Sequence, residues 1–432
     1  MKLGKVKIAV ALFMMLSVAV SSFAASSKDE TYDKLKLMVD VMELIDANYV
    51  SETDSKNLAV GAIKGVVGTL DPFSQYMEEK AYQDMKNETE GSFSGIGIRI
   101  MSKNGYITVV SPIVGTPAFR AGVLPEDRIV KINDKPAKGM STDEAVDLMR
   151  GKAGSKVKIT ISRDHVQEEL VFNLIREKIK IETVKSILLE GGIAYIRLSE
   201  FNAQSAADMK KALTDFSKQG MTAVILDLRN NPGGLLDSAI DVISMFIKGK
   251  TLALTTKGRI AGTEKEYYTK DNADFASFPF VIIVNRGSAS ASEIVSGAMQ
   301  DFKRALIVGS NTFGKGSVQT IYPLPDGTAL RLTIAKYYLP SGRPIIRADN
   351  PAPDTKNGIT PDVEVKLTID DEIKLYTQAD MIFSKDYFTV QKSTNPKDSA
   401  VFRDEALYKA IEFIRAGTVW QEIEKAHQAD KK

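Results

Sequence analysis

The spacing of apolar residues divides the chain into stretches with different predicted structures. Over residues 25–90, apolar side chains recur every three or four positions, for example at Leu35, Met38 and Met42, which predicts helices with one apolar face. The pattern repeats from Asn57 to Leu70 and stops at Asp71-Pro72. Helices cannot bury such a stripe alone, so we expect this region to dock on the same chain or on another chain.

Residues 91–175 instead carry short alternating runs that are typical of half-buried strands. Ile96–Met101 and Tyr106–Ser111 flank the turn sequence Lys103-Asn-Gly105, which predicts a β-hairpin. A capping-box sequence further along predicts a helix from Thr142 to Met149. We therefore expect a small sheet with one helix beside it.

Residues 176–370 alternate between strand and helix patterns. Buried, β-branched runs such as Ala223–Leu228 and Phe280–Val284 are separated by amphipathic runs such as Ser205–Gln219. This alternation predicts an α/β domain with parallel strands and crossover helices. Residues 371–432 are polar and helical, and either support dimerisation or fold back on the α/β domain.

The composition is that of a soluble globular protein. The 432 residues suffice for two to four domains, and 44% are hydrophobic and 26% charged. The net charge of +2 gives no electrostatic reason to expect a nucleic-acid partner. The sequence contains no glycine-rich phosphate loop and no cluster of metal ligands, so we expect neither a cofactor nor a metal.

The first 24 residues have the features of a secretory signal peptide. Lys2 and its basic neighbours precede an apolar run from Ile8 to Val20, and Ser22-Phe-Ala24 supplies the small residues of a cleavage site. The alternative is an uncleaved anchor, because Ile8–Ala25 is almost long enough to span a bilayer. We expect export to the periplasm or another extracytoplasmic space, and the absence of cysteine excludes a lipid anchor on an N-terminal cysteine.

The sequence after Phe280–Val284 predicts a strand-to-helix elbow. Gly287 and small residues form the turn, and Ser290 with Glu293 fits a capping box at the start of a helix. Such an elbow exposes a small side chain beside free backbone N–H groups, which suits a nucleophile next to an oxyanion hole. The structural alternative is that Ser290 only caps the helix.

The composition of the chain restricts which side chain could take the hydroxyl proton of Ser290. The chain has no cysteine and two histidines, of which His165 belongs to the preceding domain and His427 lies near the C-terminus. A lysine kept neutral by burial can take a hydroxyl proton instead, and Lys315 lies between two glycines that permit close backbone approach. Gln319 would lie beside Lys315 only if the segment bends.

Three motifs resemble the carboxyl-terminal processing, or tail-specific, serine proteases. They are Asp227-Leu-Arg-Asn-Asn-Pro-Gly-Gly234, Gly287-Ser-Ala-Ser-Ala-Ser-Glu293 and Thr312-Phe-Gly-Lys-Gly-Ser-Val-Gln319, in the order of that family. The resemblance implies a crotonase-like protease core over residues 176–370. It also implies that Ser290 is the nucleophile, Lys315 the general base and Gln319 the residue that orients the lysine.

The glycines of the first motif have two interpretations. They form a flexible strand-to-helix turn, or the N–H of Gly233 faces the scissile carbonyl together with that of Ala291. We favour Gly233 and Ala291 as the oxyanion hole. The resemblance also favours a dimer contact for the helical region at 25–90.

Residues 91–175 resemble a PDZ domain inserted between the helical region and the core. Phe93-Ser-Gly-Ile-Gly97 would be its carboxylate-binding loop, and a peptide tail would add to the edge strand Ile98–Met101 beside the helix. The residues expected to bind the tail are Phe93, Gly95, Ile96, Gly97, Ile98 and Arg150. For Arg150 the alternative is a cation favoured at the C-terminus of a helix.

We therefore expect an exported serine endopeptidase that selects proteins or peptides by a free, apolar C-terminus. A homodimer is expected, and an adaptor protein is a further candidate partner. One competing class is a non-catalytic PDZ adaptor on a protease-like fold, which would lack the serine or the lysine. Another is a crotonase-like acyl-CoA enzyme, against which the signal peptide and the PDZ domain argue.

Overall fold

The computed structural model describes residues 30–346, 358–383 and 402–429, apart from positions 104, 114, 165, 261, 263, 271, 272 and 379. These residues belong to two compact units. The predicted signal segment at 1–24 and His165 lie outside the described residues. Within the described ranges, no helix has both the length and the apolar character needed to cross a bilayer.

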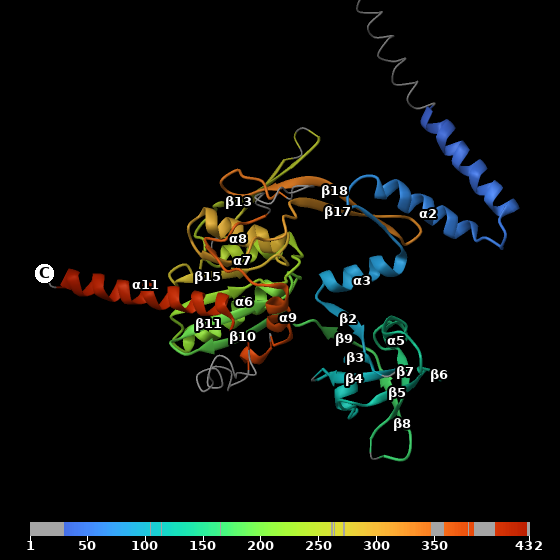
Figure 1. Ribbon diagram of the computed structural model, residues 1–432, viewed down its shortest axis with the longest axis horizontal. Helices are drawn as coiled ribbons and strands as arrows, with labels where there is room; N and C mark the ends of the chain where they lie inside the picture. Colours follow the sequence, from blue (N-terminus) through green and yellow to red (C-terminus); the bar gives the residue numbers. More distant parts are fainter. Residues whose placement is uncertain are drawn as a thin grey trace, which may run out of the picture. The chain divides into compact units, whose positions relative to one another are not determined.

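The first unit holds the N-terminal residues up to Tyr76 and two strand segments of a much later hairpin, at 321–323 and 330–332. One helix covers residues 30–48, and the next, α2, covers Ser55–Gly68 (Figure 1). Asp54 caps α2 by accepting hydrogen bonds from two backbone N–H groups. The helical region is not continuous, because strand β1 (Gln75–Met77) follows the turn that Asp71 stabilises.

Many apolar side chains of this unit stay exposed. The exposed set includes Leu35, Leu37, Val39, Leu44, Val50, Val66 and Leu70. The segments with the amphipathic pattern thus form the predicted helices, but contacts within the first unit leave much of their apolar face exposed.

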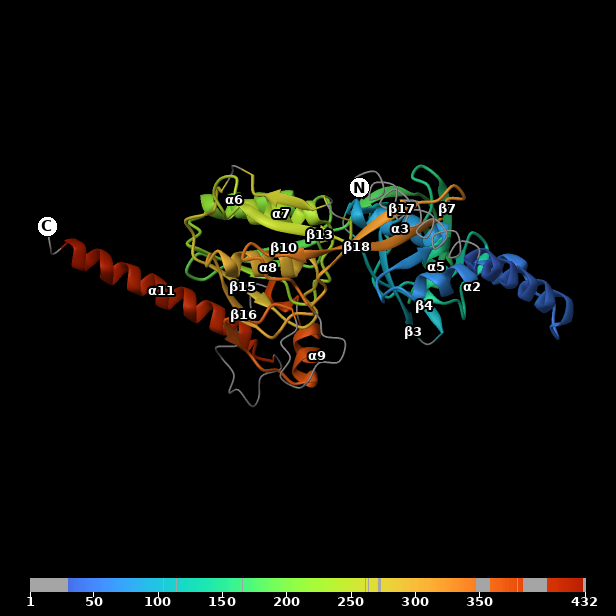
Figure 2. The same ribbon diagram turned by 90° about the horizontal axis from the view of Figure 1, so that it is seen from above.

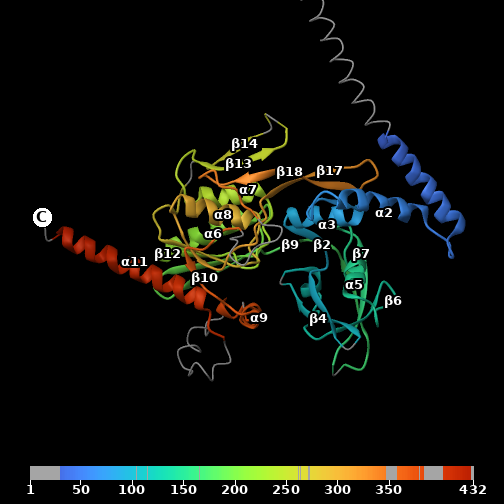
Figure 3. The same cartoon turned by 45° about the horizontal axis from the view of Figure 1, so that its top comes forward.

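In the second unit, helix α3 (Glu79–Thr89) precedes a small antiparallel sheet with the order β3-β4-β5-β7-β8, in which β6 pairs with β5 (Figure 3). The strands are β3 (Ile98–Lys103), β4 (Tyr106–Pro112), β5 (Arg128–Ile132), β6 (Lys135–Pro136), β7 (Lys156–Ser162) and β8 (Leu170–Ile175). The predicted hairpin is confirmed, and β3 lies at the edge of the sheet.

Helix α5 (Thr142–Met149) packs against this small sheet. Its capping box is complete, because the Ser141 N–H donates to Glu144 Oε2 and the Glu144 N–H donates to Ser141 Oγ. The core between helix and sheet consists of fully buried side chains such as Ile107, Ile129 and Ile159. An edge strand beside a helix is the arrangement that we expected for a PDZ domain.

The larger sheet has the order β10-β11-β12-β15-β16-β19. Its strands are β10 (Val184–Leu189), β11 (Ile193–Leu198), β12 (Ala223–Asp227), β15 (Phe280–Val284), β16 (Leu306–Gly309) and β19 (Val363–Glu364). All pairs except β10–β11 are parallel, so the predicted crossover topology is confirmed. A two-stranded ribbon of β2 (Ser92–Gly95) and β9 (Glu177–Lys180) precedes this sheet in the chain.

Helices cover both faces of the larger sheet (Figures 1 and 2). On one face lie α6 (Ser205–Lys218), α7 (Leu236–Ser244) and α8 (Ala291–Asp301). On the other face lie a 3₁₀ turn η1 (Met381–Phe383) and the first turns of α11 (Glu405–Ala429). Leu407, Ile411 and Ile414 of α11 are buried there, so the C-terminal segment folds back on this domain.

A second layer of strands completes the unit. It contains β13 (Leu252–Gly258), β14 (Lys265–Tyr268), β17 (Ser317–Pro323) and β18 (Ala329–Tyr338), with β18 paired to both β13 and β17. Helix α9 (Ile369–Thr377) follows β19. Strands β17 and β18 matter for the site because β17 begins two residues after Lys315 and pairs with β18.

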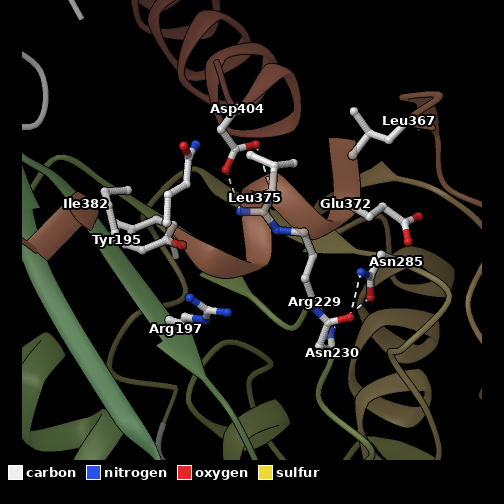
Figure 4. A pocket seen from close by; sticks show the side chains of 11 residues that line it. Tyr195, Arg197, Arg229, Asn230, Asn285, Leu367, Glu372, Leu375, Ile382 and Asp404 are labelled. Atoms are coloured by element: carbon white, nitrogen blue, oxygen red, sulfur yellow. Dashed lines mark hydrogen bonds and ion pairs between the residues drawn. The ribbon is translucent and has the colours of Figure 1, made fainter. Parts of the chain in front are cut away.

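A buried ion network joins α11 to the end of β12 (Figure 4). The Arg229 guanidinium donates to both carboxylate oxygens of Asp404, at 2.9 and 2.7 Å, and also to Asp227. Burial alone would raise the pKa of Asp227, but the charge and hydrogen bonds of Arg229 outweigh it and lower that pKa. Arg229 and Asp404 line a small cavity of about 40 Å³ together with Tyr195 and Arg197.

We predict that Asp404→Ala will destabilise the protein strongly. The change leaves one side of a buried guanidinium without its carboxylate and removes a cap from α11, which should lower the free energy of unfolding by about 3 kcal/mol. Lys211→Ala, which breaks an exposed pair with Asp215, is the control and should leave the free energy of unfolding nearly unchanged, because solvent screens such pairs. Denaturant titration measures both, and equal losses would contradict the prediction.

Candidate active site

The elbow around Ser290 is held in a conformation that non-glycine residues rarely adopt. The chain passes from β15 into α8, and Ser290 precedes the helix with φ 52° and ψ −113°. Such backbone geometry costs about 1–3 kcal/mol and persists only where surrounding contacts enforce it. Ser288 supplies one such contact, because its hydroxyl donates to the Leu228 carbonyl and accepts from the Asn285 N–H.

Glu293 is the polar centre of the elbow. Its side chain is fully buried, and Oε2 accepts the Ser290 N–H at 2.9 Å, as the capping box predicted. The same oxygen accepts the Lys315 N–H at 2.8 Å, and Oε1 accepts from Gly314 N and Thr312 Oγ1. Burial raises the pKa of Glu293, and these hydrogen bonds offset part of that rise.

Lys315 is half-buried and reaches the elbow through its backbone. Gly316 is required beside it, since an added Cβ would lie 1.8 Å from the Ile345 carbonyl oxygen. Gln319 lies in β17, which begins at Ser317, and its amide donates to Ser317 Oγ at 2.8 Å. Contact between Gln319 and the lysine amine therefore stays a prediction.

The Asn-Asn-Pro-Gly-Gly turn lies directly against the elbow. Gly233 has φ 102°, and a Cβ there would lie 2.8 Å from Ser290 Cβ and 2.9 Å from Ala291 N. Ala291 opens α8, where backbone N–H groups lack partners within the helix. The Gly233 N–H donates to Asn231 Oδ1 at 2.9 Å, so in this structure its hydrogen bond lies within the turn.

Tyr337 is a site residue that sequence reasoning missed. It lies in β18, its side chain is buried, and a hydrogen bond joins its hydroxyl to that of Ser290. Burial raises the pKa of Tyr337 to about 12, so the phenol is neutral at ordinary pH. No local pattern in the sequence indicates which side chains of β18 face the elbow.

Three regions of the chain match known protein families. Residues 192–365 match peptidase family S41, residues 108–163 match a PDZ domain, and residues 12–81 match the activating protease CtpB N-terminal domain. The chain is 41% identical over 365 residues to the carboxy-terminal-processing protease of Bartonella bacilliformis, covering 84% of this chain and 82% of that protein.

The chain belongs to the carboxy-terminal processing proteases of family S41.

Two further proteins are similar to this chain. The carboxy-terminal processing protease CtpA of Bacillus subtilis is 37% identical over 377 residues, with 87% of this chain and 76% of that protein covered. Among solved structures, the photosystem II D1 C-terminal processing protease is 29% identical, with 76% of this chain and 92% of that chain covered and a TM-score of 0.43. By its family and its curated relatives, the protein is a serine-type peptidase with a PDZ domain.

The PDZ domain of this protease brings only some of the predicted tail-binding residues together. Ile96 is buried, and Gly97, with φ 75°, lies so close to Thr116 that a Cβ would lie 2.3 Å from its Cβ. Ile98 opens the edge strand β3. These positions lie in one loop and at the start of the edge strand, and their role in binding a tail stays a prediction.

Arg150 and Phe93 form a separate pair near α3. The guanidinium lies 5.2 Å from the centre of the Phe93 ring and donates to Asp84 Oδ1 at 3.0 Å. Ser94 and Arg150 line a hollow of about 600 Å³ together with residues of α3. Gly95 lies beside this pair, with the Phe93 ring 3.4 Å from the position of an added Cβ.

We predict that Gly233→Ala will abolish activity. The new Cβ would crowd Ser290 and Ala291 at a positive φ, displacing the elbow by more than a rotamer change can relieve. Gly191→Ala is the matched control, since its φ of 85° is also positive but nothing lies within 4 Å of the added Cβ. Labelling of the serine by a fluorophosphonate should fall at least about 100-fold only in the first variant. Equal labelling of both would contradict this account.

Proposed function

We propose that this S41 protease is an endopeptidase with Ser290 as nucleophile and Lys315 as general base. The observation that carries the proposal is the single carboxylate of Glu293, which accepts the backbone N–H of both residues. Ser290 and Lys315 are 25 positions apart in the sequence, and this shared acceptor keeps their backbones adjacent. Gln319 is proposed to orient the lysine, supported by its place in the strand that begins two residues after Lys315.

In the proposed reaction, neutral Lys315 removes the hydroxyl proton of Ser290 as Oγ attacks the peptide carbonyl carbon. The carbonyl electron pair moves onto oxygen, and the intermediate collapses by breaking the C–N bond. The protonated lysine gives its proton to the leaving amine. Water, deprotonated by the same lysine, then attacks the acyl-serine ester. The bond between the carbonyl carbon and Ser290 Oγ breaks, the lysine returns its proton to Oγ, and the carboxylate product is released.

Two N–H groups are proposed to stabilise the oxyanion, those of Ala291 and Gly233. The proximity of Gly233 to Ser290 and Ala291 supports this pairing. Because the Gly233 N–H donates to Asn231 Oδ1, the substrate oxyanion would have to replace that acceptor. Substrate binding is therefore proposed to complete the oxyanion hole.

We predict that Ser290→Ala and Lys315→Ala will each lower cleavage of casein by at least about 1000-fold, because each removes one half of a unit that acts together. Gln319→Ala should reduce the rate without abolishing it. Circular dichroism and thermal melting should show that all three variants fold. Substantial activity in the lysine variant would contradict the dyad, and inhibition by a chelator that zinc reverses would indicate a metallopeptidase.

The PDZ domain is proposed to select substrates by a free, apolar C-terminus. The exposed edge of β3 beside α5 supports this role, because an extended tail can add to such an edge. Arg150 is proposed to pair with the terminal carboxylate. It contacts Asp84 in this structure, so the tail would compete with that carboxylate for the guanidinium.

We predict that Arg150→Ala will lower cleavage of a substrate with a free C-terminus by about tenfold or more, since a charge-assisted hydrogen bond contributes about 1.5–3 kcal/mol. Cleavage of the amidated substrate and labelling by fluorophosphonate should change little. Arg128→Ala, which breaks an exposed pair with Asp164, is the control. An equal loss of cleavage with the free and the amidated substrate would show that Arg150 does not recognise the terminal carboxylate.

Export and dimerisation are further parts of the proposal. The basic, apolar and small-residue pattern of residues 1–24 supports export, and N-terminal sequencing of chain recovered from the periplasm tests it. The exposed apolar residues of the first unit support a homodimer, which the mass in solution tests. Protein substrates are identified by incubating an extracytoplasmic extract with wild type and with Ser290→Ala.

A further inference from the structure

Glu293 is placed unlike an ordinary capping residue. In a capping box the side chain at N3 accepts one hydrogen bond, here from Ser290 N. Glu293 accepts three more, from Thr312 Oγ1 at 2.5 Å, Gly314 N at 2.6 Å and Lys315 N at 2.8 Å. These additional donors all come from the lysine segment, so capping alone does not explain the residue.

The carboxylate is matched to these donors in number and position. An ionised carboxylate offers about four acceptor sites, two on each oxygen. Oε1 takes the two donors of Thr312 and Gly314, and Oε2 takes those of Ser290 and Lys315. All four donors are neutral groups, and the side chain is fully buried.

A third segment closes around the same carboxylate. A Cβ on Gly358 would lie 2.5 Å from Glu293 Oε1 and 2.2 Å from Thr312 Oγ1. The Ile359 N–H donates to Thr312 Oγ1 at 2.7 Å, while that hydroxyl donates to Glu293. The serine elbow, the lysine segment and the turn at 358–359 thus meet at one side chain.

We propose that Glu293 is the positioning residue of the active site, which sets the distance and orientation between Ser290 and Lys315 through their backbone N–H groups. This inference rests on the proposed roles of those two residues. Oε2 accepts from both backbones at once, so the two loops cannot separate without breaking a charge-assisted hydrogen bond. A displacement of about 1 Å at a reacting group can cost about 100-fold in rate.

Two substitutions separate this role from general stability. Glu293→Gln keeps one oxygen, which can still face Ser290 and Lys315, while its NH₂ faces Thr312, whose hydroxyl can turn to accept. Gly314 N–H then loses its acceptor. Glu293→Ala removes all four acceptors. The Gln variant thus keeps the link between the two loops as an uncharged hydrogen-bond acceptor, while the Ala variant removes it, so comparing the two tests how much of the effect depends on that link.

Asp301→Asn is the matched control. Asp301 ends the same helix, its carboxylate is largely buried, and it accepts from Ser341 N and Arg343. It touches none of the three motifs. The experiment measures kcat and KM on a peptide substrate, the fraction of sites that a fluorophosphonate titrates, and the thermal midpoint of the full chain.

We expect kcat per titrated site to fall about tenfold in Glu293→Gln and at least about 100-fold in Glu293→Ala, with KM changed less than about twofold. Asp301→Asn should lower the thermal midpoint but keep kcat per titrated site. The inference is overturned if surviving sites of the Glu293 variants turn over at the wild-type rate, or if Asp301→Asn reduces kcat equally. Should Glu293→Ala not fold, the Gln variant alone decides.

Failure of the inference is distinguishable from failure of the proposed dyad. If Ser290→Ala and Lys315→Ala are inactive while both Glu293 variants keep kcat, the dyad stands and Glu293 does not position it. If Lys315→Ala keeps its activity, the dyad itself is wrong, whatever the Glu293 variants do.

Discussion

The candidate active site depends on the parallel pairing of β12 with β15. Leu226 pairs with Ile282 and Asp227 with Ile283, so the carboxyl ends of the two strands lie side by side. The turn after each strand therefore emerges at the same edge of the sheet, where α/β proteins place their ligands. Asn230 and Asn285 connect these turns through reciprocal hydrogen bonds of 2.9 and 3.0 Å. The glycine turn and the serine elbow meet because of this pairing.

The buried ion network extends that dependence to the C-terminal helix. Arg229 lies one residue before the turn and is held between Asp227 and Asp404, and the Tyr195 hydroxyl also donates to Asp227. Buried ion pairs add little net stability, but losing one partner leaves an uncompensated charge. The placement of α11 is thereby coupled to the turn that carries Gly233. This coupling explains why a polar C-terminal segment without catalytic motifs belongs to the folded domain.

Local patterns predicted the elements well, because they depend on local physics. The run Phe280–Val284 has the periodicity of a buried strand, and Ser141 with Glu144 caps α5 as expected. What sequence reasoning missed depends on contacts distant in sequence. The contact of Tyr337 with Ser290, and the hydrogen bonds from Thr312 and Gly314 to Glu293, require the folded sheet to bring those segments together. The sequence indicated the capping box of Ser290 and Glu293, but it did not indicate that Glu293 also accepts hydrogen bonds from the lysine segment.

Two features of the candidate site depend on the same rigid backbone. They are the positive φ of Ser290 and the hydrogen bond that the Gly233 N–H already donates to Asn231. A positive φ at a serine persists only because Glu293, Ser288 and the adjoining turn fix the backbone on both sides. The same rigid turn directs the Gly233 N–H at Asn231 Oδ1. In the proposed oxyanion hole, a developing oxyanion carries more negative charge than an amide oxygen and would displace Asn231 as the acceptor, whereas an uncharged carbonyl oxygen would gain little from the exchange. On that proposal the exchange would favour the transition state over the bound substrate, which is the condition for raising kcat.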